Sequence, residues 1–127
     1  MLTTGERRLV AKCRPPIPRG MNGVERAFAR DLEVKKRAGA ILWWEYEAVK
    51  VRIGDSCFYT PDFAVVNAQG ELELWEVKVM WRTRAGGERP GFRDDAKVKL
   101  RSASARFPAR FFGAYARKGG GFQVEEF

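Results

Sequence analysis

Apolar positions between residues 22 and 39 recur at a spacing of four. Val24, Phe28 and Leu32 follow this spacing in NGVERAFARDLEVKKRAG, and Gly39 supplies a stop after it. Side chains four residues apart lie on the same side of a helix, so they can form one apolar face. The pattern therefore predicts an amphipathic helix over this segment.

The next part of the chain is rich in aromatic and β-branched residues, which are typical of strands. Turn-forming residues interrupt it at 54–56 and again at 67–70. The third segment also alternates leucine with glutamate, as a strand with one buried face does. We predict three strands, ILWWEYEAVKVRI (41–53), CFYTPDFAVV (57–66) and ELELWEVKVMW (71–81).

The last third of the chain combines a glycine-rich segment with a second helix and further strands. Arginine, glycine and proline dominate residues 82–92, a composition that predicts a mobile loop. Apolar residues at helical spacing in RDDAKVKLRSASARF predict a helix that Pro108 ends. RFFGAYAR reads as a strand, KGGG as a turn and FQVEEF as a short final strand. The expected order is helix, three strands, helix, one or two strands.

At 127 residues the chain fits one domain, which we place at 22–127. Residues 1–21 have several prolines and basic residues without an apolar period, so we expect a flexible basic arm. No apolar run approaches the roughly 20 residues that span a bilayer. Two cysteines form no disulfide or metal motif. These features predict a soluble, unexported protein in a reducing cytoplasm.

The charge balance favours a polyanionic partner. The chain has 24 Lys and Arg against 16 Asp and Glu, a formal net charge of +8, and a pI near 9.9. It also contains no histidine, which excludes Ser/His/Asp and Cys/His catalysis, histidine bases and most zinc sites. An enzyme built from this sequence has to use carboxylates, lysine and a hard metal ion.

Three charged residues on the second and third predicted strands fit that chemistry. Glu76 and Lys78 are two positions apart, so they point to the same face of a strand. If the two strands pair through the turn at 67–70, Asp62 lies beside Glu76. Two neighbouring carboxylates repel each other and call for a cation, and their oxygen atoms favour Mg²⁺ or Mn²⁺. Lys78 could orient or help deprotonate a water and offset charge on a phosphorane.

A plainer interpretation of Glu76 and Lys78 is a charge pair on a solvated face, worth only about 0.2 to 1 kcal/mol. Leu72 and Leu74 share their face, however, and a charged pair that continues an apolar face is costly to bury without a function. We therefore favour the catalytic interpretation.

The same residues carry a resemblance to a known family. PDF followed by ELWEVK resembles the PD-(D/E)XK phosphodiesterase superfamily, which includes restriction enzymes and junction resolvases. Within it, the domain is most similar to small phage and prophage endonuclease domains that resemble Holliday junction resolvases. The resemblance implies a restriction-endonuclease-like α/β core, a mixed central β-sheet flanked by helices in α-β-β-β-α-β order. The matching segments are YTPDF, LWEVK, RDDAKVKL and GGGFQVEEF.

The resemblance also implies roles for individual residues. It makes Asp62 and Glu76 metal ligands, the carbonyl of Val77 a third ligand, and Lys78 the catalytic lysine. In the superfamily a glutamate on the first helix often joins the metal shell, and Glu25 is the candidate here.

Glu25 has a second interpretation that involves no catalysis. Asn22 and Glu25 have the spacing of a helix N-cap and its third residue, and an acid in the first turn favours the helix dipole. The sequence leaves both roles open.

Basic residues near the expected site are candidates for DNA contact. Those in the glycine-rich loop could close over a substrate, and those on the second helix could meet phosphates together. A floppy loop and a solvated helix face are the alternatives. The candidates are Arg82, Arg84, Arg89, Arg93, Lys97, Lys99 and Arg101.

We expect Mg²⁺-dependent hydrolysis of DNA phosphodiesters, with Mn²⁺ as a substitute, by activated water. The resemblance points to branched DNA such as four-way junctions in phage recombination, to a homodimer, and to the host bacterial cytoplasm. The alternatives are a nicking or end-processing nuclease on linear or single-stranded DNA, a non-catalytic DNA-binding accessory protein, and an RNA-binding protein.

Overall fold

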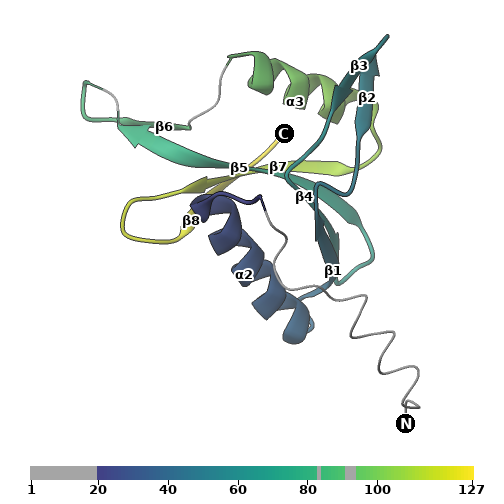
Figure 1. The fold of residues 1–127 in the computed structure, drawn as a ribbon, viewed down its shortest axis with the longest axis horizontal. Coiled ribbons are helices and arrows are strands. Elements are labelled where there is room, and N and C mark those ends of the chain that lie inside the picture. The colour runs from purple at the N-terminus through teal and green to yellow at the C-terminus, as the bar shows by residue number, and fades with distance from the viewer. Residues whose placement is uncertain (1–19, 83, 91–93) are drawn as a thin grey trace.

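A mixed β-sheet lies between two helices, α2 on one face and α3 on the other (Figure 1). The computed structural model describes residues 20–82, 84–90 and 94–127. The helices are α2 (Gly23–Arg37) and α3 (Asp94–Arg106). The strands are β1 (Ile41–Tyr46), β2 (Val51–Gly54), β3 (Cys57–Tyr59), β4 (Phe63–Asn67), β5 (Leu72–Arg82), β6 (Glu88–Pro90), β7 (Arg110–Ala116) and β8 (Phe122–Glu126). The predicted α/β class with a mixed sheet is confirmed.

The main sheet has the spatial order β1-β4-β5-β7-β8, and β6 pairs with β5 beside this path. Strands β5 and β7 are parallel, whereas β1 and β4, β4 and β5, and β7 and β8 pair antiparallel. A parallel pair needs a crossover connection, and α3 lies within the one that joins β5 to β7. Strands β2 and β3 form a separate two-stranded sheet.

Helix α2 matches the segment predicted from its apolar spacing. Phe28 and Leu32 are buried, and the helix ends before Gly39, whose φ of 78° is one that glycine adopts readily. Met21, at the end of the range expected as an arm, is buried in the same cluster. Residues 1–19 of that expected arm lie outside the described residues.

Alternation along β4 divides the core between the two faces of the sheet. Phe63 and Val65 face α2 and pack with Phe28, whose ring centroid is 5.1 Å from that of Phe63. Ala64 faces the other way, into a cluster formed by α3 and the β2–β3 hairpin. Burying a phenylalanine contributes roughly 1.5–3 kcal/mol, so Phe28 and Phe63 help to fix α2 on the sheet.

The first predicted strand, 41–53, is wrong as a single element. The chain leaves the main sheet after Tyr46, because Glu47 has a φ of 48° and its N–H donates to the carbonyl of Asp62 at 2.8 Å. Residues 51–54 then pair with β3 instead of continuing beside β4.

The second predicted strand, 57–66, also divides. Strand β3 ends at Tyr59 and β4 begins at Phe63, with Pro61 buried between them. Proline has no N–H for a ladder and restricts the residue before it, which accounts for the break. The two breaks together release the β2–β3 hairpin from the main sheet.

The segment expected as a mobile loop, 82–92, is partly ordered. Residues 88–90 form β6, which pairs antiparallel with the end of β5 and extends it into a long hairpin (Figure 1). Turn residues 84–87 are exposed. The third predicted strand, the second helix and the two final strands are confirmed, with α3 ending two residues before Pro108.

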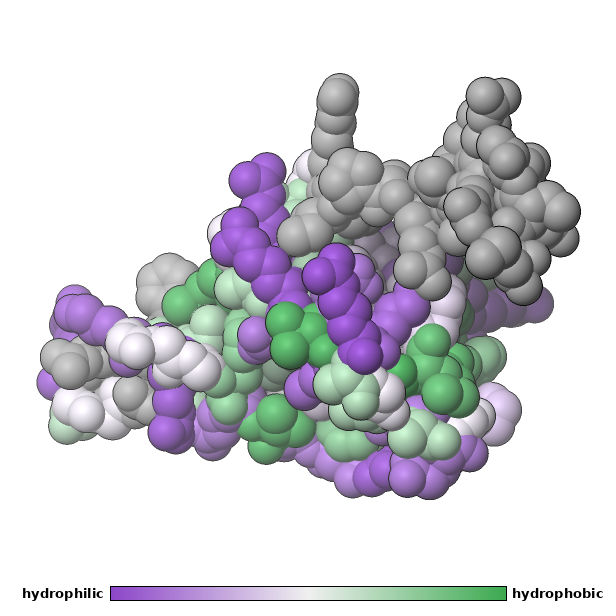
Figure 2. Space-filling model, turned by 90° about the horizontal axis from the view of Figure 1, so that it is seen from below, coloured by the Kyte–Doolittle hydropathy of each residue, from purple (hydrophilic) through white to green (hydrophobic). Residues whose placement is uncertain are grey.

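The surface on the α2 side carries hydrophilic and hydrophobic residues intermixed (Figure 2). Across the described part of the chain, neither α2 nor α3 is long and apolar enough to cross a membrane.

Candidate active site

Strand β5 brings Glu76 and Lys78 to the face of the sheet that α3 and the hairpin cover. Leu74 on this face is fully buried, and Glu76 two residues later is only 7% exposed. Lys78 is half-buried, with 32% of its side chain exposed. The apolar face therefore continues into two charged residues, the buried Glu76 and the partly exposed Lys78. They do not form a charge pair that is fully exposed to solvent.

Asp62 lies beside Glu76, as the sequence predicts. In the β4–β5 register Phe63 is opposite Trp75, which places the preceding residue, Asp62, next to Glu76. The Oδ2 atom of Asp62 accepts the Val77 N–H at 2.8 Å, so the side chain is tied directly to β5. Asp62, just before β4, and Glu76, in the middle of β5, therefore supply two adjacent carboxylates.

Glu76 has two partners from different parts of the chain. The Tyr59 hydroxyl, at the end of β3, donates a hydrogen bond to its Oε2 atom. The Nζ atom of Lys78 lies 3.3 Å from its Oε1 atom. Tyr59 is itself buried, packed with Val51 and Ile53 of the hairpin. The hairpin therefore positions a donor for the site.

Burial and mutual repulsion act on both carboxyl groups. Burial and then the charge of Glu76 raise the pKa of Asp62 to about 7, against the lowering effects of the Val77 N–H and of Lys78. Burial also raises the pKa of Glu76, although Tyr59 and Lys78 oppose the shift. Burial and the charge of Glu76 raise the pKa of the Tyr59 phenol, which keeps it a hydrogen-bond donor. The positive charge of Lys78 therefore does not offset the burial and the mutual repulsion of the two carboxylates.

Glu25 combines features of both of its predicted roles. Its N–H donates to Asn22 Oδ1 at 2.9 Å and its Oε1 accepts from Asn22 Nδ2 at 2.7 Å, which confirms Asn22 as the N-cap. Its other oxygen, Oε2, is buried and has no hydrogen-bond partner among the described residues. Its negative charge contributes to the raised pKa values of Asp62 and Glu76. Glu25 thus caps α2 and also lies within electrostatic reach of the site.

Tyr59 is the functional candidate that the sequence did not single out. It was part of the YTPDF segment, but the predicted strand 57–66 gave it no special position. Its apolar surroundings on the inner side of β3 arise only when the hairpin folds over α3. In the sequence, the sign that Tyr59 could belong to the site was its position three residues before Asp62.

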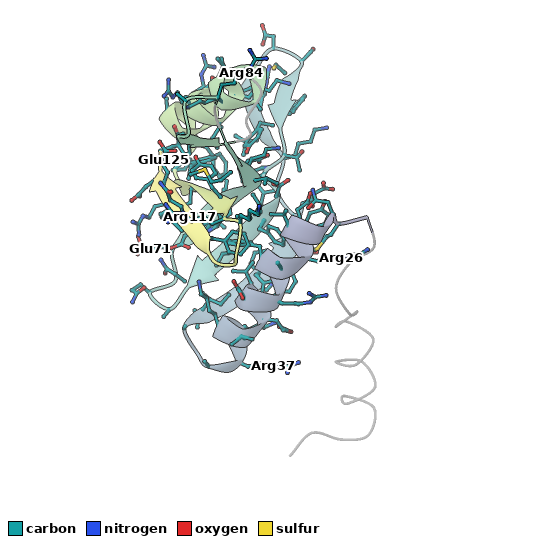
Figure 3. The ribbon with its side chains drawn as sticks, turned by 90° about the vertical axis from the view of Figure 1, so that its left-hand side faces the viewer. Arg26, Arg37, Glu71, Arg84, Arg117 and Glu125 are labelled. Carbon is teal, nitrogen blue, oxygen red and sulfur yellow. The ribbon has the colours of Figure 1, made fainter. Side chains whose placement is uncertain are left out.

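The basic residues predicted to contact DNA whose side chains the structure describes lie on the β5–β6 hairpin and on α3. Arg84 is exposed at the tip of the β5–β6 hairpin, and Figure 3 shows it on the α3 side, away from Arg26 and Arg37 of α2. On α3, Lys99 and Arg101 are exposed and Lys97 is half-buried. Arg93 and the side chains of Arg82 and Arg89 lie outside the described residues.

Trp44 and Trp75 pack against the core on the α2 side, while Trp43 is exposed. Glu45 on β1 and Glu47 just after it are exposed surface acids.

The donor set suits a hard cation. Among the described residues, no group of three or more Asp, Glu, His or Cys side chains could hold a metal ion. Asp62 and Glu76 would therefore act as two carboxylates, with water, substrate oxygens or a main-chain carbonyl such as that of Val77 as further ligands. Mg²⁺ is commonly held by one or two carboxylates and several waters, so these residues fit it. No protein-family model, curated protein or solved structure matches this chain.

Proposed function

We propose that the protein is a Mg²⁺-dependent endodeoxyribonuclease that hydrolyses phosphodiester bonds with water. The observation that carries the proposal is the placement of Asp62 and Glu76 side by side, with raised pKa values, and of Lys78 against them. Burying two like charges is costly unless a cation joins them. A catalytic role for Asp62 and Glu76 explains why the fold accepts the free-energy cost of burying them together.

Each residue has a role that its position supports. Asp62, held by the Val77 N–H, and Glu76, held by Tyr59, would bind the ion. A bound Mg²⁺ supplies Lewis acidity toward a phosphoryl oxygen and lowers the pKa of water. Lys78 is half-exposed at the rim, so its ammonium can reach a solvent-side phosphate or orient a water while it remains close to Glu76.

The polyanionic substrate follows from charge as well as chemistry. A net charge of +8 favours association with nucleic acid, and Lys99, Arg101 and Arg84 are exposed on the α3 side of the sheet, where the site lies. Among DNA substrates we favour branched molecules such as four-way junctions. This choice rests on the resemblance to the PD-(D/E)XK resolvase-like domains in phage recombination.

A junction resolvase makes two symmetric cuts, so a homodimer is part of the proposal. Leu42 and Trp43 are exposed on β1, the edge strand of the main sheet. We place the contact between two copies along this edge. A nicking or end-processing nuclease would use the same residues as a monomer.

One observation favours a second candidate, a DNA-binding accessory protein without catalysis. Both oxygens of Glu76 already have partners, Tyr59 and Lys78, in the absence of a cation. A purely structural charge cluster would also be satisfied in this way. Binding without cleavage separates this candidate from the nuclease.

The deciding experiment compares a synthetic four-way junction with its matching linear duplex, in Mg²⁺ or in EDTA. Wild type is expected to cut the junction in Mg²⁺ only, and Lys78→Ala to lose at least about a hundredfold in rate. Lys35→Ala, an exposed lysine on α2, is the matched control and should cut normally. Tight, salt-sensitive binding without any cutting by wild type would reject the nuclease and leave the accessory protein.

A further inference from the structure

The outer side of the β2–β3 hairpin gathers two cations around an exposed aromatic ring. Lys50 precedes β2, and Arg52 lies two residues later, so both point to the same side. Phe58 on β3 is directly opposite Arg52 and is 46% exposed. The Lys50 Nζ atom lies 4.7 Å from the centre of the Phe58 ring.

The two sides of this hairpin differ sharply in character. The inner residues Val51, Ile53 and Tyr59 are buried against α3, and Tyr59 reaches Glu76. The outer residues Lys50, Arg52 and Phe58 are exposed. An exposed phenylalanine beside cations is the combination with which proteins hold nucleic-acid strands, because the ring stacks on a base or sugar while the cations meet phosphates.

Arg106 adds a third positive charge at the end of α3. A surface pocket of about 420 Å³ is lined by Arg52, Gly54, Asp55 and Arg106. Arg52 also forms an ion pair with Asp55 at 2.9 Å, in which both side chains are well exposed. Exposed ion pairs of this kind are weak, so a phosphate can take the place of the Asp55 carboxylate.

The position of the hairpin relates this surface to the candidate active site. Phe58 is followed directly by Tyr59, the donor to Glu76, and after three more residues by Asp62. Four residues span at most about 14 Å. One DNA strand of a duplex has a phosphate about every 3.4 Å of helix axis, so the distance corresponds to at most about four nucleotides.

We propose that the outer surface of the hairpin, Lys50, Arg52 and Phe58 with Arg106 beside it, binds a DNA strand next to the scissile phosphate. Lys50, Arg52 and Arg106 contact the phosphates, and Phe58 packs on a sugar or an unpaired base. This inference rests on the proposed nuclease function and specifies where its substrate lies. Contacts with the backbone and with a base face carry no sequence information, so the surface suits recognition of DNA shape.

The test is equilibrium binding of a fluorescent four-way junction to the full chain in EDTA, where no cleavage occurs. Lys50→Ala/Arg52→Ala is compared with Arg30→Ala/Lys35→Ala, which removes the same charge from exposed positions on α2. Phe58→Ala tests the ring separately. Circular dichroism confirms that each variant is folded, and all substituted side chains are exposed.

We expect the hairpin double variant and Phe58→Ala each to bind about tenfold more weakly, and the α2 variant to stay within about twofold of wild type. Loss of two phosphate contacts should also reduce the slope of log K against log salt by about 1.8. Hairpin variants that bind like the α2 variant would overturn this inference and leave the nuclease proposal intact. Failure of the wild type to bind DNA at all would overturn both.

Discussion

Tyr59 is the residue on which the position of Glu76 most depends. It donates to one carboxylate oxygen, while Lys78 approaches the other from the same strand. Lys78 has to remain available for chemistry at the rim, whereas Tyr59 is buried, with only 8% of its surface exposed. We therefore interpret Tyr59 as a positioning residue.

Tyr59→Phe should keep the packing of the ring and remove only the donor. The free energy of unfolding should fall by about 1–2 kcal/mol, because Glu76 remains buried with one partner fewer. The cleavage rate at saturating DNA should fall roughly tenfold while KM for DNA stays the same, and the Mg²⁺ dependence should shift to higher concentration. Steady-state kinetics over a Mg²⁺ series measure this. An unchanged Mg²⁺ dependence would contradict the positioning role.

Asp62→Asn removes one of the two neighbouring charges while its amide oxygen can still accept the Val77 N–H. We expect the variant to be more stable than wild type without metal, because the repulsion with Glu76 is gone. It should lose cleavage and no longer gain stability from Mg²⁺. Thermal unfolding with and without Mg²⁺ measures both effects. A wild-type Tm that does not respond to millimolar Mg²⁺ would argue against a metal site.

At the scale of single elements, the central strands are held by close packing around small residues. Strand β7 lies beside β5, and Gly113 is opposite Glu76 in their parallel register. A Cβ atom at Gly113 would lie 2.5 Å from the hydroxyl oxygen of Tyr115. Tyr115 is buried and its hydroxyl donates to Glu125 on β8 at 2.6 Å. The glycine thus makes room for a ring that joins two strands.

Gly113→Ala should therefore displace the Tyr115 ring and weaken the contact between β7 and β8. We expect a loss of about 1–3 kcal/mol in the free energy of unfolding, the usual cost of overfilling a packed core. Denaturant titration measures it. Gly119→Ala, in the turn that follows β7, has open space but a φ of 95°, and serves to compare backbone strain with overpacking. The Tyr115→Phe background removes the hydroxyl. If Gly113→Ala lowers the free energy of unfolding as much there as it does in the wild type, the hydroxyl contact has no role in the loss.

The elements also show how far sequence patterns reach. Helix α2, the turn at 67–70 and β5 are set by apolar period, capping and turn chemistry, all of which are local. The break at 47–50 is not local, because the N–H of Glu47 bonds the carbonyl of Asp62, which is distant in sequence, and the predicted strand 41–53 was wrong for that reason. The break at 60–62 has a local cause, Pro61, which the predicted strand 57–66 did not take into account.

At the scale of the whole molecule, the candidate site affects how stability responds to pH. The folded-state pKa of Asp62, about 7, is above its ordinary value of 3.8, and that of Glu76 is also raised. Between about pH 4 and 7 the folded protein therefore holds more protons than the unfolded chain. Its free energy of unfolding falls across this range, as linkage requires, and this loss levels off above pH 7.

Unfolding of wild type and of Asp62→Asn from pH 4 to 8 tests this dependence. The difference between the two proteins should grow as the pH rises toward 7, to a Tm difference on the order of 5 °C. Because a metal ion competes with protons for the carboxylates, the gain from Mg²⁺ should increase over the same range. A difference that is constant with pH would contradict the raised pKa values.

By itself the sequence determined the class of the fold, both helices, the site strand β5 and the pairing of Asp62 with Glu76 and Lys78. These follow from periodicity, turn residues and the alternation of strand side chains, which need only near neighbours. Only the tertiary structure decided that the β2–β3 hairpin leaves the sheet, that Tyr59 reaches Glu76, and that Glu25 influences both carboxylates. Such contacts depend on how separate elements pack together, and no local pattern in the chain specifies them.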